Sequence, residues 1–283
     1  MEEAAKVLVK LPGIGIDLNM GCSAPDIYRY GAGISWMTKP REETQEMVRA
    51  VSRVLNDNAG EKKRLSVKLR LGDDDFTDEG FFSFCDMLVG EGVQLLTLHP
   101  RTKKEKLTRP PRYSYCQQLA ERYKGHVING KPVEIYLNGN VHDKASYDYA
   151  AATCPDITGI MISRAAVQAP WIFASLSTNP VSLSSIPVSV SSIPVSVSLS
   201  GSTRQSINLE QLCLDYITLI EQYQPPEFWK TRLQRFFTYF SQNFKFAHYA
   251  QTQFLNAADN NDLRARVIDF FNKCSDERFL ELK

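Results

Sequence analysis

Residues 14–22 read IGIDLNMGC, and this stretch decides how the rest of the chain is interpreted. Its apolar run predicts a short buried strand, and Gly21 and Cys22 stand where that strand opens into a loop. Most cysteines are small buried residues, but Gly21 gives no side-chain cover, and Pro25 and Asp26 are turn-forming residues. Because α/β barrels keep their chemistry at the carboxyl ends of parallel strands, the stretch predicts an accessible thiol at a strand end.

Outward from this stretch, strand-like runs alternate with helical patterns. The expected strands are Ile14–Asn19, Ser66–Leu71, Leu95–His99, Glu134–Asn138 and Gly159–Ser163. The expected helices are Arg41–Leu55, Glu79–Val89, Tyr113–Tyr123 and Lys144–Ala152, with the end of another helix at Glu2–Lys10. Repeated βα units predict an α/β fold with a parallel sheet. Five strands are visible, so a complete (β/α)8 barrel would need three more.

A low-complexity segment separates this part from the rest. Residues 180–200 repeat a seven-residue unit three times, starting at Pro180, Pro187 and Pro194. Proline in every unit forbids a continuous helix, and the Ser/Pro bias predicts an extended or disordered linker without catalytic function. From Leu209 onward, apolar residues recur at helical spacing. We therefore expect three parts: a partial barrel (1–175), a linker (176–204) and a small helical domain (205–283).

Composition favours a soluble cytoplasmic protein. The net charge is +1, so any signal for nucleic acid must be local. The six cysteines form no Cys-x-x-Cys pair and have no metal-ligand spacing, which favours a reducing compartment and no metal site. No apolar run approaches the roughly 20 residues that span a bilayer, and the charged N-terminus lacks an apolar signal core. We expect no membrane contact; the oligomeric state stays open.

Polar residues follow the other expected strands as well. Lys68 and Arg70 lie on one face of their strand, because side chains alternate, and two buried cations need an anionic partner. Structural salt bridges would explain them equally well. The remaining strand ends carry His99 and Arg101, then Asn138, Gly139 and Asn140, then Ser163 and Arg164. Backbone N–H groups of the last loops of barrels often hold a phosphate, and Gly139 suits such close approach.

Two local basic surfaces point to RNA. The first follows His99 and carries six cations against one acid: Arg101, Lys103, Lys104, Lys106, Arg109 and Arg112, with Glu105. The second, residues 228–258, contains no Asp or Glu and interleaves aromatic residues with Lys230, Arg232, Arg235 and Lys245. Basic and aromatic residues together can bind RNA phosphates and stack on bases. We expect most of these aromatic residues to form a core and the cations to be functional.

Taken in order, these motifs resemble the tRNA-dihydrouridine synthase family. The resemblance rests on residues 17–22, Gly31-Ala32-Gly33, Lys39-Pro40, residues 67–72, 99–102, 138–140 and 163–166, and Pro170-Trp171-Ile172-Phe173. It covers about residues 1–175 and, more loosely, the helical region after 204. It implies an FMN-dependent (β/α)8 TIM-type barrel followed by a helical domain that binds tRNA. Such enzymes reduce uridine in tRNA to 5,6-dihydrouridine, with NADPH as the reductant.

The resemblance also implies a role for each motif residue. Cys22 would be the general acid that protonates carbon 5 of uracil, and Asn19 would orient the base. Arg70 and Arg101 would face the substrate. The FMN-binding residues would be Lys68, His99, Asn138, Gly139, Asn140, Ser163 and Arg164, the last five around the phosphate. The target uridine would be pulled out of the tRNA fold into the pocket.

Departures from the family pattern leave alternatives open. Family members usually have Cys-Pro where this chain has Cys22-Ser23, and Ser163 stands where glycine is common. Cys22 should follow the fourth strand of the barrel, so we expect an N-terminally truncated barrel that lacks three βα units. The alternatives are a catalytically inactive remnant that still binds RNA, or another FMN-dependent barrel oxidoreductase of the dihydroorotate-dehydrogenase kind. The basic surfaces disfavour the latter, because a small substrate needs neither.

Overall fold

The computed structural model describes residues 1–58, 60, 62–73, 75–105, 108–176 and 206–281. They form two compact units, described separately below. The first comprises Met1–Val141 and Ala145–Ser163, and the second comprises His142–Lys144 and Arg164–Lys283. This division falls earlier in the chain than the boundary at 175 expected from the sequence, and the expected linker at 176–204 lies almost wholly outside the described residues.

The first unit is built on a parallel five-stranded sheet in the order β1-β2-β3-β6-β7. Its strands are β1 (Gly15–Met20), β2 (Arg64–Arg70), β3 (Leu95–His99), β6 (Glu134–Asn138) and β7 (Gly159–Met161). Asn19 pairs in register with Lys68, and Arg70 with His99. The parallel α/β prediction is confirmed, and all five expected strands are present. The last is shorter than expected, because β7 ends at Met161.

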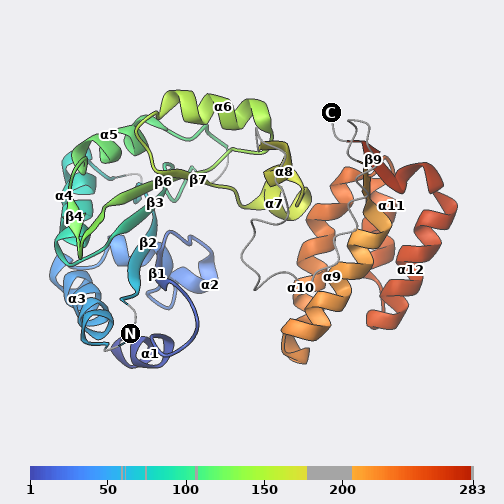
Figure 1. Ribbon diagram of the computed structural model, residues 1–283, viewed down its shortest axis with the longest axis horizontal. Coiled ribbons are helices and arrows are strands. Elements are labelled where there is room, and N and C mark those ends of the chain that lie inside the picture. Colours follow the sequence, from blue (N-terminus) through green and yellow to red (C-terminus); the bar gives the residue numbers. More distant parts are fainter. Residues whose placement is uncertain (59, 61, 74, 106–107, 177–205, 282–283) are drawn as a thin grey trace. The chain divides into compact units, whose positions relative to one another are not determined.

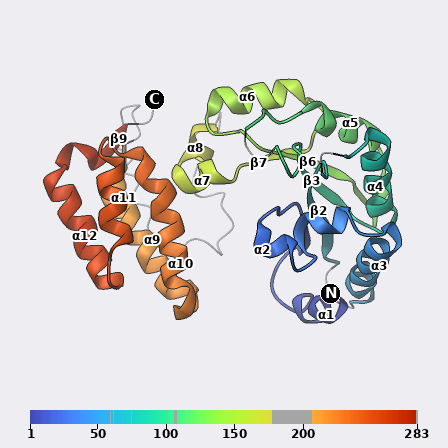
Figure 2. The same ribbon diagram turned by 180° about the vertical axis from the view of Figure 1, so that it is seen from behind.

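Helices cover one face of this sheet (Figures 1 and 2). They are α1 (Glu2–Leu8), α3 (Arg41–Asp57), α4 (Asp78–Gly90), α5 (Ser114–Arg122) and α6 (Lys144–Thr153). Alternate strand residues such as Leu18, Val67 and Leu137 point into the core beneath these helices and are almost fully buried. Shorter elements join them: α2 (Pro25–Tyr28), the 3-10 helix η1 (Gly33–Met37), and the hairpin β4 (Val127–Ile128) and β5 (Lys131–Pro132).

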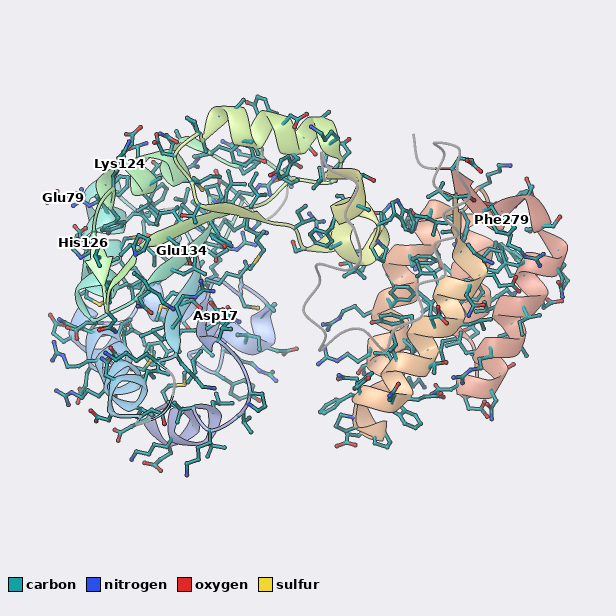
Figure 3. All side chains as sticks on the ribbon, viewed as in Figure 1. Asp17, Glu79, Lys124, His126, Glu134 and Phe279 are labelled. Carbon is teal, nitrogen blue, oxygen red and sulfur yellow. The ribbon has the colours of Figure 1, made fainter. Side chains whose placement is uncertain are left out.

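The opposite face of the sheet is mainly polar. Strand alternation places on it Asp17, Asn19, Arg64, Ser66, Lys68, Arg70, Thr97, His99, Glu134, Tyr136 and Asn138. Figure 3 labels Asp17 on β1 and Glu134 on β6, which belong to this set. Nearly all purely parallel sheets are covered on both faces. The polar face of this sheet is not suited to pack under an apolar layer, so we expect it to line a binding site.

The second unit is a helical bundle with a small two-stranded sheet. Its elements are α7 (Arg164–Gln168), α8 (Ile172–Leu176), β8 (Ser206–Asn208), α9 (Leu209–Tyr223), α10 (Pro226–Phe240), η4 (Ser241–Asn243), α11 (Ala247–Leu255), α12 (Asn260–Lys273), η5 (Ser275–Glu277) and β9 (Phe279–Glu281). Aromatic residues dominate its core, and Phe236, Phe237 and Phe240 are almost fully buried. Trp171 packs edge-on against Phe240, so α7 and α8 belong to this bundle. The expectation that most aromatic residues of segment 228–258 form a core is confirmed.

Candidate active site

The loop that carries Cys22 is held by Asn19. Its side-chain oxygen accepts hydrogen bonds from the N–H groups of Gly21 (3.2 Å) and Cys22 (3.1 Å). Arg70 fixes the same loop from the neighbouring strand, because its Nε donates to the Gly21 carbonyl at 3.0 Å. Cys22 itself is half-buried, which is less open than the sequence indicated. The strand end therefore presents a thiol on a loop with a defined conformation.

Gly33 closes this loop from the other side. The Ile34 N–H donates to the Cys22 carbonyl at 2.9 Å, so the chain passes directly over the cysteine. Gly33 has a φ of +62°, and a Cβ there would clash with the Cys22 carbonyl and lie 3.1 Å from the Cys22 Cβ. Only glycine fits this position, for both conformational and steric reasons. The sequence signal was available in Gly31-Ala32-Gly33, but the contact with Cys22 was not predicted.

Lys68 is a half-buried cation on the polar face, in register with Asn19. Its ammonium group makes no ion pair or hydrogen bond with the residues that the structure describes. Burial lowers its pKa, and the neighbouring charge of Arg70 lowers that pKa further. The charge of Asp17 on the same face acts in the opposite direction, but no carboxylate of the described residues pairs directly with the ammonium group. A half-buried cation in this setting favours an anionic or electron-rich ligand.

Arg70 also lacks a carboxylate partner within the described part of the chain. It donates instead to the carbonyls of Gly21 (3.0 Å) and Thr102 (3.2 Å). Burial lowers its pKa, with a further contribution from the positive charge of Arg101. Within the described residues, Lys68 and Arg70 therefore form no salt bridge, and the structural explanation that the sequence left open is not supported there.

His99 and Arg101 meet at the end of β3. The Arg101 guanidinium lies 2.9 Å from His99 Nε2. Because arginine has only donors, His99 must accept at Nε2 and carry its proton on Nδ1. Both side chains are buried, and Arg101 also donates through Nε to the Arg109 carbonyl at 2.5 Å.

Gly139 lies against this histidine. Its φ is +125°, and a Cβ there would lie 2.8 Å from His99 Cδ2. The Tyr113 hydroxyl donates to the Gly139 carbonyl at 2.7 Å, and burial raises the pKa of Tyr113 to about 12. The loop after β6 is therefore drawn tightly over the His99 ring. Tyr113 was not predicted from the sequence, where it appeared only as the start of a helix.

The other predicted phosphate-binding residues occupy different settings. Asn138 is buried, and its side-chain nitrogen donates to the Met161 carbonyl on β7 at 2.8 Å. Asn140 has a φ of +60°, which turns the chain after Gly139. Ser163 ends the first unit, and Arg164 begins α7 in the second. Asn19, Cys22, Lys68 and Arg70 are thus brought together, and His99, Arg101 and Gly139 form the adjoining part of the edge.

Most described cations of the loop after His99 are engaged within the protein. Lys103 lies 3.4 Å from an Asp73 oxygen and stacks over the Tyr28 ring at 3.5 Å. Arg112 pairs with Glu105 and lies over the Phe76 ring. Lys106 lies outside the described residues. This loop consequently offers less free positive charge than its sequence indicated.

The helical unit distributes its charges differently. Five of its cations have a carboxylate within 4 Å: Lys245, Arg264, Arg266, Lys273 and Arg278. Among residues 206–281, the three that have none are Lys230, Arg232 and Arg235, which all lie on α10 and are exposed. The uncompensated positive charge of this unit is therefore concentrated on one helix.

No helix in the described residues is long and apolar enough to cross a membrane. Those residues also contain no group of three or more histidine, cysteine or acidic side chains arranged to hold a metal ion.

Comparison with known proteins identifies relatives. The chain is 27% identical over 183 residues to a protein of Cryptococcus neoformans named tRNA-dihydrouridine(47) synthase, covering 62% of this chain and 24% of that protein. It is 28% identical over 165 residues to a Mus musculus protein named as tRNA-dihydrouridine(47) synthase-like, covering 57% of this chain and 23% of that protein. The chain thus spans about a quarter of the length of the curated relatives it matches.

A solved structure and a family model complete the comparison. The crystal structure of a putative dihydrodipicolinate synthase family protein from Coccidioides immitis is similar at 12% identity and a TM-score of 0.43, over 98% of this chain and 89% of that one. That score is too low to assign a fold. The model of the family described as Dihydrouridine synthase (Dus) matches residues 1–255. With this match over most of its length and the relatives above, the chain belongs to the dihydrouridine synthase family.

Proposed function

We propose that this chain carries the catalytic edge of a tRNA-dihydrouridine synthase, with FMN as cofactor and NADPH as reductant. The observation that carries the proposal is the juxtaposition of the Cys22 loop with Lys68 and Arg70, two half-buried cations without a described carboxylate partner. Family membership, and relatives named as NAD(P)(+)-type tRNA-dihydrouridine synthases, support the same reaction class.

The residues present fit a flavin. The Lys68 ammonium group, which has no hydrogen-bond or ion-pair partner in the part of the chain that the structure describes, is suited to the electron-rich edge of the flavin ring system. His99, whose Nε2 faces the Arg101 guanidinium, is proposed to contact the flavin as well. Gly139, Asn140, Ser163 and Arg164 are proposed to hold the phosphate, and Asn138 to brace that loop through Met161. Reduced FMN, when bound, supplies the hydride that adds to carbon 6 of uracil.

The chain's own residues supply the rest of the reaction. Cys22 holds a proton on Sγ and delivers it to carbon 5, a general-acid role. Asn19 fixes the Cys22 loop through its oxygen, while its side-chain nitrogen, which makes no hydrogen bond within the described residues, orients the uracil. Arg70 and Arg101 face the substrate, and their charge attracts the RNA backbone.

The two units take separate roles in this proposal. The polar face of the sheet lines the interior of an N-terminally truncated (β/α)8 barrel (1–175), and residues 205–283 bind tRNA through the cations of α10. We propose that the reduction of uridine in tRNA takes place in the cytoplasm. A chain that binds RNA but no flavin would instead be an inactive member of the family. The following experiment distinguishes the active enzyme from this inactive form.

The first experiment records the visible absorption spectrum of the purified chain with FMN and then assays dihydrouridine formation in tRNA with NADPH. We expect bound flavin, activity, and a loss of about 100-fold or more for Cys22→Ala with flavin retained. Cys274→Ala, which removes the other partly exposed thiol, should be unchanged. A folded chain that takes up no FMN would exclude the enzyme and leave the RNA-binding remnant.

A further inference from the structure

The corner between α9 and α10 exposes two aromatic rings. Tyr223, the last residue of α9, is 59% exposed, and Phe228, in the first turn of α10, is 48% exposed. Three other aromatic residues of α10 differ from Phe228, because Phe236, Phe237 and Phe240 are almost fully buried. Other rings of this unit are exposed as well, among them Phe246 and Phe279, but Phe228 is the one that shares a helix with the three cations that lack a carboxylate partner among residues 206–281.

The corner is rigid. Pro225 and Pro226 fix the backbone between the helices, and the Trp229 indole N–H donates to the Gln224 carbonyl at 2.8 Å. The Phe228 N–H donates to the Pro225 carbonyl at 2.9 Å. Rings on a preorganised turn lose little conformational freedom when they bind a ligand.

The exposed ring of Phe228 is aligned with the uncompensated cations of the helical unit. Arg232 follows it by four residues and Arg235 by seven, so the three side chains share one face of α10 over about 10 Å. On α9, Tyr216 stacks on Phe236 at 3.7 Å between ring centroids and lies close enough to Arg232 and Arg235 to sense their charge. The surface therefore combines flat apolar rings with positive charge.

We propose that the corner formed by Tyr223, Phe228, Arg232 and Arg235 is a stacking site for an unpaired RNA nucleotide. The base lies against the exposed rings, and the neighbouring phosphates contact the two arginines. This rests on the proposed RNA binding by α10 and adds to it the form of RNA that is recognised. Paired bases are unavailable for such stacking, whereas a loop or bulge can present a base outward. An apolar protein partner would not need the uncompensated charge.

The test measures binding of the full chain to a short unstructured oligoribonucleotide by fluorescence anisotropy, with the same oligonucleotide carrying abasic sites and an RNA duplex as comparisons. We expect Phe228→Leu to weaken binding of the base-bearing strand about tenfold and to leave the abasic strand and the duplex unchanged. Phe228→Trp should retain the affinity. Phe279→Leu is the matched control, because Phe279 is 58% exposed in the same unit but lies beside Arg278, which pairs with Glu210 (Figure 3).

The outcomes separate this inference from the proposed function. Equal weakening on base-bearing and abasic strands, or no effect of Phe228→Leu while the α10 arginines are still required, would overturn the stacking site alone. No binding of any RNA by the wild-type chain would overturn both the stacking site and the RNA-binding role. Because Phe228 is exposed, the melting temperature of Phe228→Leu should match that of the wild type, and this is checked first.

Discussion

At the scale of single residues, the candidate site depends on contacts that hold polar groups in place rather than on the groups alone. Asn19 and Arg70 bind the backbone of the Cys22 loop, and Arg101 fixes the tautomer of His99. Two glycines, Gly33 and Gly139, permit the closest approaches. A substitution at such a position therefore acts on a neighbour's placement before it acts on chemistry.

Gly33→Ala should displace Cys22 without removing it. A Cβ at Gly33 clashes with the Cys22 carbonyl, whereas one at Gly31, of similar φ (+69°), comes no closer than 3.7 Å to the flexible Lys39 side chain. We expect Gly33→Ala to lower stability by about 1–3 kcal/mol and to change the rate at which a thiol reagent modifies Cys22, measured in a Cys274→Ser background. Gly31→Ala should change that rate little. Equal effects of the two substitutions would show that backbone strain, not the contact with Cys22, is responsible.

Lys68→Met should stabilise the fold. Burial lowers the pKa of Lys68 in the folded chain, so the unfolded chain binds this proton more tightly and the charged group opposes folding at neutral pH. We expect the free energy of unfolding to rise by about 1 kcal/mol at pH 7. The gain should shrink as the pH rises through the lowered pKa towards the ordinary lysine value of about 10.4.

Denaturant unfolding at several pH values measures this effect, with the exposed Lys62→Met as control. If FMN binds beside Lys68, the same substitution weakens flavin binding, so stability and binding move in opposite directions. A Lys68→Met chain that is less stable than the wild type would mean that the ammonium group is favourably solvated in the free protein.

At the scale of elements, salt bridges and charged hydrogen bonds between neighbouring helices supplement the apolar core. Asp86 on α4 accepts hydrogen bonds from Arg122 Nε (2.7 Å) and the Tyr123 hydroxyl (2.9 Å) at the end of α5. On the other side of α4, Arg49 of α3 binds Glu91. These pairs hold the three helices side by side on the apolar face of the sheet.

Asp86→Asn should reveal a pH-dependent contribution to this packing. The hydrogen bond from Arg122 lowers the pKa of Asp86 in the folded chain, so its stabilisation is present above the unfolded pKa of about 3.9 and is lost as the pH falls through the lowered value. Because both partners are partly exposed, we expect a loss of about 0.5–1 kcal/mol at pH 7 and less near pH 2. Urea unfolding at both pH values tests this, with Glu46→Gln as control, because Glu46 is exposed and forms no salt bridge within the described residues. An equal loss at both pH values would assign the effect to packing.

At the scale of the whole molecule, alternation and periodicity predicted the βα order, and the strands Leu95–His99 and Glu134–Asn138 match to the residue. Alternation and periodicity depend only on residues close together in the sequence, and the burial of every second strand residue produces such a local pattern. They could not show that Lys103 and Arg112 are engaged by Tyr28, Asp73 and Glu105, because those contacts join distant segments. For the same reason the sequence could not predict that Gly33 lies against Cys22 or that the Tyr113 hydroxyl binds the Gly139 carbonyl. Both contacts join residues that only the folded chain brings together.

The distribution of charge over the whole molecule leads to the last prediction. With a net charge of +1, the chain has no general attraction for RNA, so binding must come from where cations lack acidic neighbours. Replacing Lys230, Arg232 and Arg235 by glutamine should weaken tRNA binding and reduce the slope of log affinity against log salt by up to about 3.

The matched control replaces Arg264, Arg266 and Lys273 of α12, which removes the same charge from the same unit but from cations already paired with Glu221, Asp262 and Asp269. We expect this control to retain most of the salt dependence, because paired cations release few counterions from RNA. Filter binding across a salt series, with both variants checked for folding by circular dichroism, compares them directly. Equal loss in the two variants would show that total charge, rather than its concentration on α10, governs RNA binding, and would remove the role assigned to that helix.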